Sequence, residues 1–387
     1  MNRIDENKWI EFRRDLHRNP ELSFQESRTA AKVAQWLSEL GLSVRTGVGG
    51  HGVVADLQGD RPGPTIALRA DMDALPIQEE TILPFASEVP GVMHACGHDV
   101  HTTVLLGAAE LLAAQREILA GRIRFIFQSA EEILSGAKRM IDEGVLDDVD
   151  EIYGLHNLPT LSVGKVATTP GLFFGSIDRI EIRIDGRGGH GSMPELCADP
   201  IVAASAVVMG LQTAVSREIA PIEPAVMSIG SIHAGTANNV IPPTVKMTGT
   251  VRVFSEQVRS QMPQRIRRLT EHIATGYRCT AQVHYIEQVP ATINEEACES
   301  AVRQSIRPII GEDNIVNTVP STGGEDFALY LKQVPGCYFW LGSGPQEHAD
   351  QAYGLHSPRF VVEEACIPLG AKLLAAIGLT RLGGQHS

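Results

Sequence analysis

The sequence lacks the clustered cysteines of a disulfide-rich protein and the basic excess of a nucleic-acid-binding protein. Its 387 residues include only six cysteines, spread singly along the chain, and this usage is typical of reduced thiols. Lys and Arg number 33 against 46 Asp and Glu, which gives a formal net charge of -13. Because nucleic acids are bound through clustered positive charge and the basic residues here are scattered, we expect no nucleic-acid partner.

Long apolar runs are also absent. No stretch reaches the roughly eighteen consecutive apolar residues of a membrane-spanning helix. The chain begins with MNRIDENKWIEFRRDLHRNPELSFQE, which alternates charges where a signal peptide would have an apolar core. We therefore expect no membrane partner and a cytoplasmic location. With 43% hydrophobic and 20% charged residues, the composition is that of a globular protein with a sizeable core.

Helix and strand patterns alternate through the first part of the chain. Residues 27–40 place apolar groups at helical spacing and stop before Gly41, and residues 102–119 indicate another helix. Residues 64–75 and 122–132 are each typical of a buried strand with an acidic end. This alternation predicts an α/β fold, a three-layer domain with a largely parallel sheet. The carboxyl ends of such strands are where α/β sheets usually carry their chemistry.

The pattern changes near residue 178. From there the segments follow the order β-α-β-β-α-β, which is typical of a smaller two-layer α+β domain of ferredoxin-like type. Segments resembling the first domain lie on both sides of it, and the chain exceeds the roughly 250 to 300 residues that one core supports. We therefore predict a large domain formed by residues 1–178 and 292–387 and an inserted domain formed by residues 179–291.

The nonapeptide MHACGHDVH concentrates potential metal ligands. Cys96 and His98 lie two residues apart, which in an extended segment directs both side chains to the same side. Thiolate and imidazole are preferred ligands of zinc-like ions. His94 and His101 could add ligands or serve as hydrogen-bonding residues in a turn, and Asp99 could orient a liganding imidazole.

Four other short stretches carry groups that a metal would bind. They are RADMDAL with Asp71 and Asp73, QSAEE with Glu131 and Glu132, GLHNLP with His156, and GLHSPRF with His356. Two unpaired carboxylates just past a buried strand are costly, so the adjacent glutamates favour a site. The two aspartates could instead be exposed caps, and each histidine alone is equally consistent with a satisfied core residue.

The number of candidate ligands favours a centre with two metal ions. One Cys, three His and one Glu exceed the four ligands of a structural zinc. Two ions lower the pKa of a shared water towards about 7, and such centres hydrolyse bonds. The second glutamate would then move the proton of that water. Two G-x-G-x-x-G matches, at 47–52 and 186–191, lack the directly following helix that a dinucleotide site requires.

Several motifs, in this order, resemble the amidohydrolase subfamily of the peptidase M20 family. They are LHRNPELSFQE, RADMDALPIQE, MHACGHDVHTT, QSAEE, GLHNLP, GGHGSMP, TANNVIP, TGTVR and GGEDF. The subfamily includes N-acyl-L-amino acid amidohydrolases, hippurate hydrolases and plant auxin-conjugate hydrolases. The resemblance implies two divalent ions (Zn, Mn, Ni or Co) per subunit, with the ligands Cys96, His98, Glu132, His156 and His356. It also implies that Glu131 is the general base and that Asp73 orients the centre.

The same resemblance assigns roles in the inserted domain. This domain would mediate assembly as a homodimer or a dimer of dimers, and His190 would reach the partner subunit's active site and stabilise the oxyanion. Asn239 and Arg252 match positions that contact substrate, Arg252 through a charge-assisted bond to a carboxylate. An incidental imidazole in a Gly-rich turn and a solvated strand arginine are the ordinary alternatives. The sequence departs from the subfamily at two positions. It has Ser129 where the subfamily usually carries Pro, and Glu195 where His is frequent.

We therefore expect a metal-dependent amidohydrolase that cleaves small-molecule N-acyl-L-amino acids. A dipeptidase or a deacetylase of the N-acetyl-diaminopimelate type is the alternative within the same family. A catalytically silent, metal-stabilised binding protein is the alternative from another class, and it leaves the unpaired Glu131 unexplained.

Overall fold

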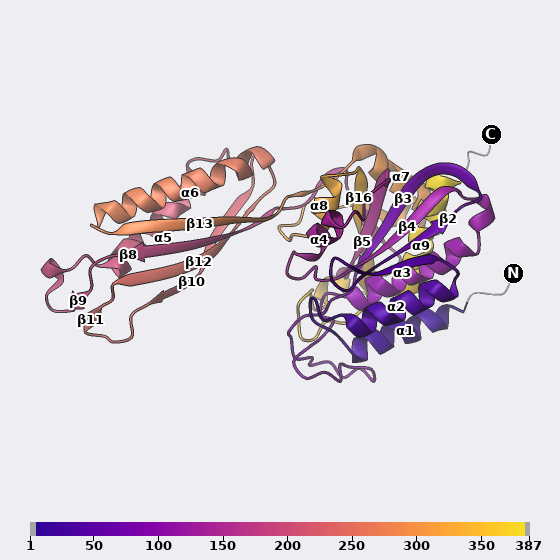
Figure 1. Ribbon diagram of the computed structural model, residues 1–387, viewed down its shortest axis with the longest axis horizontal. Helices are drawn as coiled ribbons and strands as arrows, with labels where there is room; N and C mark the ends of the chain where they lie inside the picture. The colour runs from indigo at the N-terminus through magenta and orange to yellow at the C-terminus, as the bar shows by residue number, and fades with distance from the viewer. Residues whose placement is uncertain (1–4, 384–387) are drawn as a thin grey trace. The chain divides into compact units, whose positions relative to one another are not determined.

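The computed structural model describes residues 5–383, and the chain folds into two compact units (Figure 1). Unit 1 comprises the chain up to Phe173, Ile293–Val319 and the chain from Glu325 onward, and unit 2 comprises Phe174–Thr292 and Pro320–Gly324. The predicted inserted segment, 179–291, falls within unit 2. Its role in assembly stays a prediction. The predicted first domain also included residues 1–4 and 384–387, which lie outside the described residues.

An eight-stranded sheet forms the centre of unit 1, in the order β1-β2-β4-β3-β5-β16-β6-β15. Its strands are β1 (Ser43–Val48), β2 (Gly52–Gln58), β3 (Arg61–Asp71), β4 (Ala120–Gln128), β5 (Glu151–Ser162), β6 (Val166–Thr168), β15 (Ile315–Asn317) and β16 (Gly336–Gly344). The central strands are parallel, because β3 pairs in parallel with β4 and β5, and β5 with β16. The predicted α/β fold with a largely parallel sheet is confirmed.

The helices of unit 1 pack on this sheet and on one another. They are α1 (Glu6–Arg18), α2 (Ser27–Glu39), α3 (His98–Ala113), α4 (Gly136–Asp142), α7 (Glu296–Ile310), α8 (Phe327–Leu331) and α9 (Cys366–Leu382). Helices α3 and α9 contact each other and the central strands, and both are buried along most of their length. The helix expected at 102–119 begins earlier, at His98, which places that residue in the first helical turn.

A four-stranded antiparallel sheet and two helices form unit 2. The strands are β8 (Ile177–Asp185), β10 (Ala225–Ala234), β12 (Thr244–Val253) and β13 (Thr280–Val289), and the helices are α5 (Pro200–Ser216) and α6 (Glu256–Gly276). The sheet order is β10-β12-β8-β13, which is the ferredoxin-like arrangement expected from the element order. Alternate residues of β8 are buried, among them Ile180, Ile182 and Ile184, so one face of the strand meets the core.

Short elements complete the described chain. They are β7 (Gly171–Phe174), β9 (Gly189–His190), β11 (Val240–Ile241), β14 (Thr292–Asn294), η1 (Arg116–Ile118), η2 (Pro194–Leu196), η3 (Glu312–Asn314) and η4 (Ala349–Gln351). Strands β9 and β11 pair with each other in unit 2. Between residues 5 and 383, no helix is both long enough and apolar enough to span a bilayer.

Candidate metal centre

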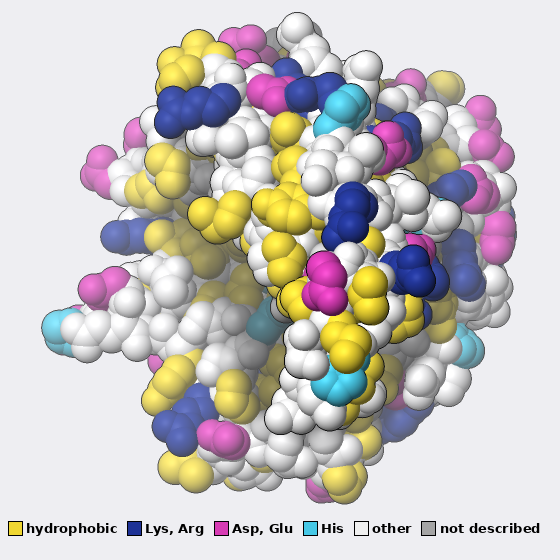
Figure 2. All heavy atoms as spheres, turned by 90° about the vertical axis from the view of Figure 1, so that its left-hand side faces the viewer, with side chains coloured by type: hydrophobic (Ala, Val, Ile, Leu, Met, Phe, Trp, Pro, Cys, Tyr) yellow, Lys and Arg dark blue, Asp and Glu magenta, His cyan; other side chains and the backbone are white. Residues whose placement is uncertain are grey.

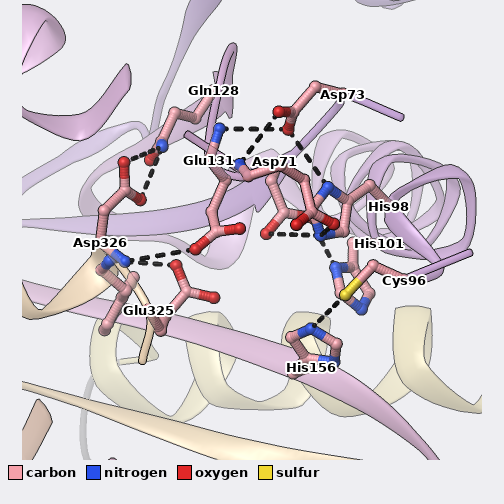
Figure 3. Close-up of polar contacts among 12 residues, drawn as sticks. Asp71, Asp73, Cys96, His98, His101, Gln128, Glu131, His156, Glu325 and Asp326 are labelled. Carbon is pink, nitrogen blue, oxygen red and sulfur yellow. Dashed lines mark hydrogen bonds and ion pairs between the residues drawn. The ribbon is translucent and has the colours of Figure 1, made fainter. Parts of the chain in front are cut away.

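Three adjacent parallel strands bring polar side chains together at one edge of the unit 1 sheet. Asp71 ends β3 and pairs with Gln128, the last residue of β4. On the other side of β3, Arg69 pairs with Gly154 of β5, so Asp71 stands level with His156. Because the carboxyl ends of parallel strands meet at one edge, the residues that follow β3 and β4 lie close to His156 (Figure 3).

A left-handed glycine turns Cys96 and His98 toward this edge. Gly97 has a φ of 89°, and His98 is the first residue of α3, so the extended geometry expected from the Cys-x-His spacing is wrong. A Cβ at Gly97 would stand 2.2 Å from Nδ2 of Asn157, which leaves room only for glycine. The turn places Cys96 Sγ 3.3 Å from His156 Nε2, and ligand atoms of Cys96, His98 and His156 lie within 4.8 Å of one another.

The adjacent glutamates lie on a strained turn after β4. Ala130 has a φ of 57°, a left-handed conformation that few residues other than glycine adopt. The backbone N–H groups of Glu131 and Glu132 donate to the two carboxylate oxygens of Asp73, at 3.1 and 3.0 Å. Glu132 then faces two histidines, with its oxygens 3.8 Å from His98 Nε2 and 3.5 Å from His356 Nε2.

In two of the histidines, hydrogen bonds determine which ring nitrogen remains available to bind a metal ion. His98 Nδ1 lies 3.2 Å from Asp73 Oδ1, and His156 Nδ1 lies 2.8 Å from the carbonyl oxygen of Asn157. Both oxygens can only accept in these pairs, so Nδ1 carries the hydrogen and each neutral ring keeps a lone pair on Nε2. This is the arrangement in which partner oxygens orient metal-ligating histidines.

Two of the remaining polar residues of the nonapeptide, His101 and Asp99, contact other groups. His101 Nδ1 donates to Asp71 at 2.6 Å, and its Nε2 accepts from the backbone N–H of Asn157 at 2.9 Å, so both ring nitrogens are engaged. His94 is buried but belongs to no group of potential ligands among the described residues. Asp99 is paired with Arg13 and His17, so the idea that it orients a ligand is wrong. The carboxylate that contacts the imidazole of His98 is that of Asp73.

The cluster is strongly acidic, and apart from the exposed His356 its side chains are largely buried. Burial raises the pKa of Glu131 well above its usual range, and Glu325 and Asp326 raise it further. Burial raises the pKa of Glu132 to about 7. Burial alone would lower the pKa of His98, but Asp71 and the neighbouring carboxylates outweigh it and raise that pKa to about 10. Such an excess of buried carboxylates favours a bound cation.

The donor set fits divalent transition ions. Within residues 5–383, the buried atoms His98 Nε2 and Glu132 Oε1 have no hydrogen-bond partner. Separations of 3.3 Å between Cys96 and His156 and 3.5 Å between Glu132 and His356 suit two ligands of one ion, given metal–ligand distances of about 2.0 to 2.3 Å. Thiolate, imidazole and carboxylate in one buried cluster are the ligands that zinc and its neighbours prefer.

Comparisons with known proteins agree with this chemistry. The sequence model of peptidase family M20/M25/M40 matches residues 67–379. The chain belongs to this family. This M20 protein is 42% identical over 381 residues to N-acetylcysteine deacetylase of Bacillus subtilis, with 96% of each chain covered. It is also 42% identical over 366 residues to thermostable carboxypeptidase 1 of Saccharolobus solfataricus, covering 94% of this chain and 92% of the relative.

A solved structure shares the same fold. The crystal structure of a dinuclear metal-binding peptidase of the M20 family from Bacillus subtilis matches with a TM-score of 0.85 and 40% identity, covering 97% of this chain and 98% of that one. The expected family is thereby confirmed. The M20 protein is a metallo-amidohydrolase, an enzyme that hydrolyses C–N bonds of amides.

A buried arginine, which we did not identify from the sequence, links acidic residues on two sides of the site. Arg69 of β3 contacts Asp71 at 2.8 Å and both Glu325 and Asp326 at 3.0 Å. The backbone N–H of Asp326 in turn donates to Glu131 Oε1 at 3.4 Å. An arginine within a nearly all-apolar strand was the available signal, because a buried charge requires partners.

The three candidate residues of the inserted domain lie in unit 2. His190 of β9 is exposed, and its Nδ1 accepts the backbone N–H of Ser192 at 3.1 Å, so a neutral ring carries its hydrogen on Nε2. Asn239 is adjacent, since its carbonyl oxygen accepts the N–H of Gly191 at 2.8 Å. Arg252 of β12 lines a hollow of about 360 Å³ elsewhere in this unit.

Proposed function

We propose that this M20 enzyme cleaves the amide bond of N-acyl-L-amino acids and releases a carboxylic acid and a free amino acid. The observation that carries the proposal is the buried carboxylate of Glu131, which lies beside the potential metal ligands His98 and Glu132. Glu132, its neighbour, faces the histidines, and Glu131 receives a long hydrogen bond from Asp326. The similarity to N-acetylcysteine deacetylase supports the substrate class.

Two divalent ions, Zn, Mn, Ni or Co, are the proposed cofactors. The side chains that would hold them are Cys96, His98, Glu132, His156 and His356. When bound, such ions act as Lewis acids and make water acidic enough to lose a proton near neutral pH. Asp73 holds the imidazole of His98 in the tautomer that presents Nε2, and its other contacts hold the turn that carries both glutamates.

Glu131 is the proposed proton carrier. Its carboxylate would take a proton from the attacking water and deliver it to the nitrogen of the leaving amine. Burial and nearby carboxylates raise its pKa, while nearby cations lower the pKa of a carboxyl group. A carboxyl group whose pKa is subject to both effects can be ionised when it takes the proton from water. It can then keep that proton until the C–N bond breaks.

Residues of unit 2 complete the proposal. His190 would donate its Nε2–H to the carbonyl oxygen as negative charge develops there, and its hydrogen bond from Ser192 selects the tautomer that can do so. Asn239 and Arg252 would contact the substrate, Arg252 through its carboxylate. Burial lowers the pKa of Arg252 from its usual range, but an arginine guanidinium stays charged at neutral pH.

A homodimer, or a dimer of such dimers, is the proposed assembly. Unit 2 exposes large apolar side chains on helix α5 and on strand β10, among them Val202, Met209, Val226 and Ile232. Figure 2 is viewed with unit 2 toward the reader and shows hydrophobic side chains at this surface among charged ones. Strand β10 is also an edge of its sheet. Exposed apolar groups and a free strand edge favour association.

A substrate panel tests the proposed function. The enzyme would be stripped of metal with a chelator, reloaded with Zn, Mn, Ni or Co, and assayed with hippurate, N-acetyl amino acids, N-acetyl-diaminopimelate and dipeptides. We expect the highest kcat/KM with an N-acyl-L-amino acid such as N-acetylcysteine. A higher kcat/KM with dipeptides, which the similarity to a carboxypeptidase would favour, would instead establish a dipeptidase.

A further inference from the structure

The segment between α1 and α2 contacts two neighbouring parts of the candidate metal centre, the residues that follow β3 and the turn that follows β4. Leu22 forms a parallel bridge with Ala74, just beyond β3. Ser23 Oγ donates to Asp73 Oδ2 at 2.6 Å. Glu26, at the end of the segment, accepts hydrogen bonds across more than 100 residues of sequence, from Ser129 Oγ at 2.7 Å and from the N–H of Ala130 at 2.8 Å.

Two buried carboxylates therefore satisfy three consecutive N–H groups of the turn after β4. Glu26 accepts from Ala130, and Asp73 accepts from Glu131 and Glu132. A turn that has left the sheet has no ladder partners, and buried N–H groups require acceptors. Ala130 is also left-handed, with a φ of 57°, a conformation that persists only where the surroundings impose it.

Glu26 has no other evident task in its own helix. It occupies the N-cap position of α2 but makes no side-chain capping bond there. Glu21 does this instead, since its carboxylate accepts from the N–H groups of Arg28 at 3.0 Å and Thr29 at 2.7 Å. Glu26 is completely buried, and burial raises its pKa. A carboxyl group in this setting is costly unless its bonds serve the structure around it.

We infer that Glu26 is a positioning residue, which acts through Ser129 and Ala130 to direct the carboxylates of Glu131 and Glu132. The inference rests on the proposed function, which gives those two carboxylates their roles. The bond from Ser129 requires the hydroxyl group of that side chain.

The first test compares Glu26→Gln with Glu21→Gln, a matched change in the same segment. An amide offers one acceptor oxygen instead of two, so in Glu26→Gln the hydroxyl of Ser129 and the N–H of Ala130 no longer each have a carboxylate oxygen. Since small misplacements of reacting groups cost up to about 100-fold in rate, we expect kcat on the best N-acyl amino acid to fall at least about 10-fold, with KM within about 2-fold. Glu21→Gln should lower Tm and leave kcat unchanged.

Amide hydrogen exchange of residues 129–136 provides a readout independent of turnover. We expect this peptide to exchange at least about 10-fold faster in Glu26→Gln than in the wild type or in Glu21→Gln, because the turn loses an acceptor. Unchanged exchange and unchanged kcat in Glu26→Gln would overturn the inference. Faster exchange together with a wild type that hydrolyses no N-acyl amino acid would instead overturn the proposed function.

The smaller change Ser129→Ala keeps the inference testable if Glu26→Gln does not fold. Removing one hydroxyl should lower kcat about 3-fold. In the double variant the Ser129→Ala change should add no further loss, because residues that act through one contact are not additive. Losses that multiply in the double variant would show that Ser129 acts independently of Glu26 and would contradict the proposed route.

Discussion

The functional candidates of the two units have opposite surroundings. In unit 1, Asp73 is buried and its carboxylate contacts His98, Ser23 and the backbone of both adjacent glutamates. In unit 2, His190 is exposed and is held by Ser192, two residues away. The geometry of the candidate site in unit 1 is therefore preorganised by its own fold. The proposed role of His190 instead depends on the substrate or subunit that comes into contact with it. The following predictions substitute residues of one unit or the other and compare the effects.

The largest expected effect is that of Glu131→Gln in unit 1. An amide cannot carry the proton, so kcat should fall by about 10³-fold or more. The metal content, measured by atomic emission, should remain close to that of the wild type, because Glu132 is the neighbour that faces the histidines. Normal hydrolysis of N-acyl amino acids by this variant would show that another group is the base.

In unit 2, His190→Ala should lower kcat by about 100-fold, which is the usual cost of one oxyanion donor. Metal content should not change. His272→Ala is the matched control, because His272 is an exposed imidazole of the same unit on helix α6, and its kcat should equal that of the wild type. Equal activity of the two alanine variants would leave His190 without a catalytic role.

Mixing two inactive variants decides whether His190 acts across a dimer. In a heterodimer of Glu131→Gln and His190→Ala subunits, one site would combine an intact Glu131 with the partner subunit's His190. Equal mixing with free exchange of subunits should then restore about a quarter of wild-type activity, because half the dimers have one intact site. No recovery, despite exchange shown by native mass spectrometry, would confine His190 to its own subunit.

The smallest expected effect concerns surface charges on the two units. Asp15 of unit 1 contacts Arg28 and Lys32. Although burial opposes the change, their hydrogen bonds hold the pKa of Asp15 below 3.8. A depressed carboxyl pKa stabilises the fold above pH 3.8, and this contribution is lost as pH falls through the folded value. Asp15→Asn should therefore lower Tm by about 1 to 3 °C at pH 7 and by less at pH 3.

Asp185 of unit 2 is the comparison for this stability test. It is similarly exposed, but its ion pair is with Arg183. The hydrogen bond from Arg183 lowers its pKa. Differential scanning fluorimetry should show a smaller loss of Tm at pH 7 for Asp185→Asn than for Asp15→Asn. Equal losses, or losses that persist at pH 3, would mean that the ion pairs are not their cause.

Local patterns predicted the strands and their polar ends well. The acidic ends of the strands expected at 64–75 and 122–132 do lie at one edge of the sheet. The turn at Gly97 was not predicted, because the residue that leaves no room for a side chain there is Asn157, which is 60 positions away. The spacing of Cys96 and His98 alone could not reveal that contact.

Residue types in the sequence determined the chemistry of this M20 enzyme: thiol, imidazole and carboxylate groups placed just beyond buried strands. They also determined the order of the elements, because the periodicity of apolar residues is a local property. Only the tertiary structure decided that His101 is engaged by Asp71 and Asn157 while His98 keeps Nε2 available. It also decided that Glu26 accepts hydrogen bonds from the turn that carries Glu131 and Glu132. The physical reason is that hydrogen-bond partners and burial are set by segments distant in sequence, which local patterns do not encode.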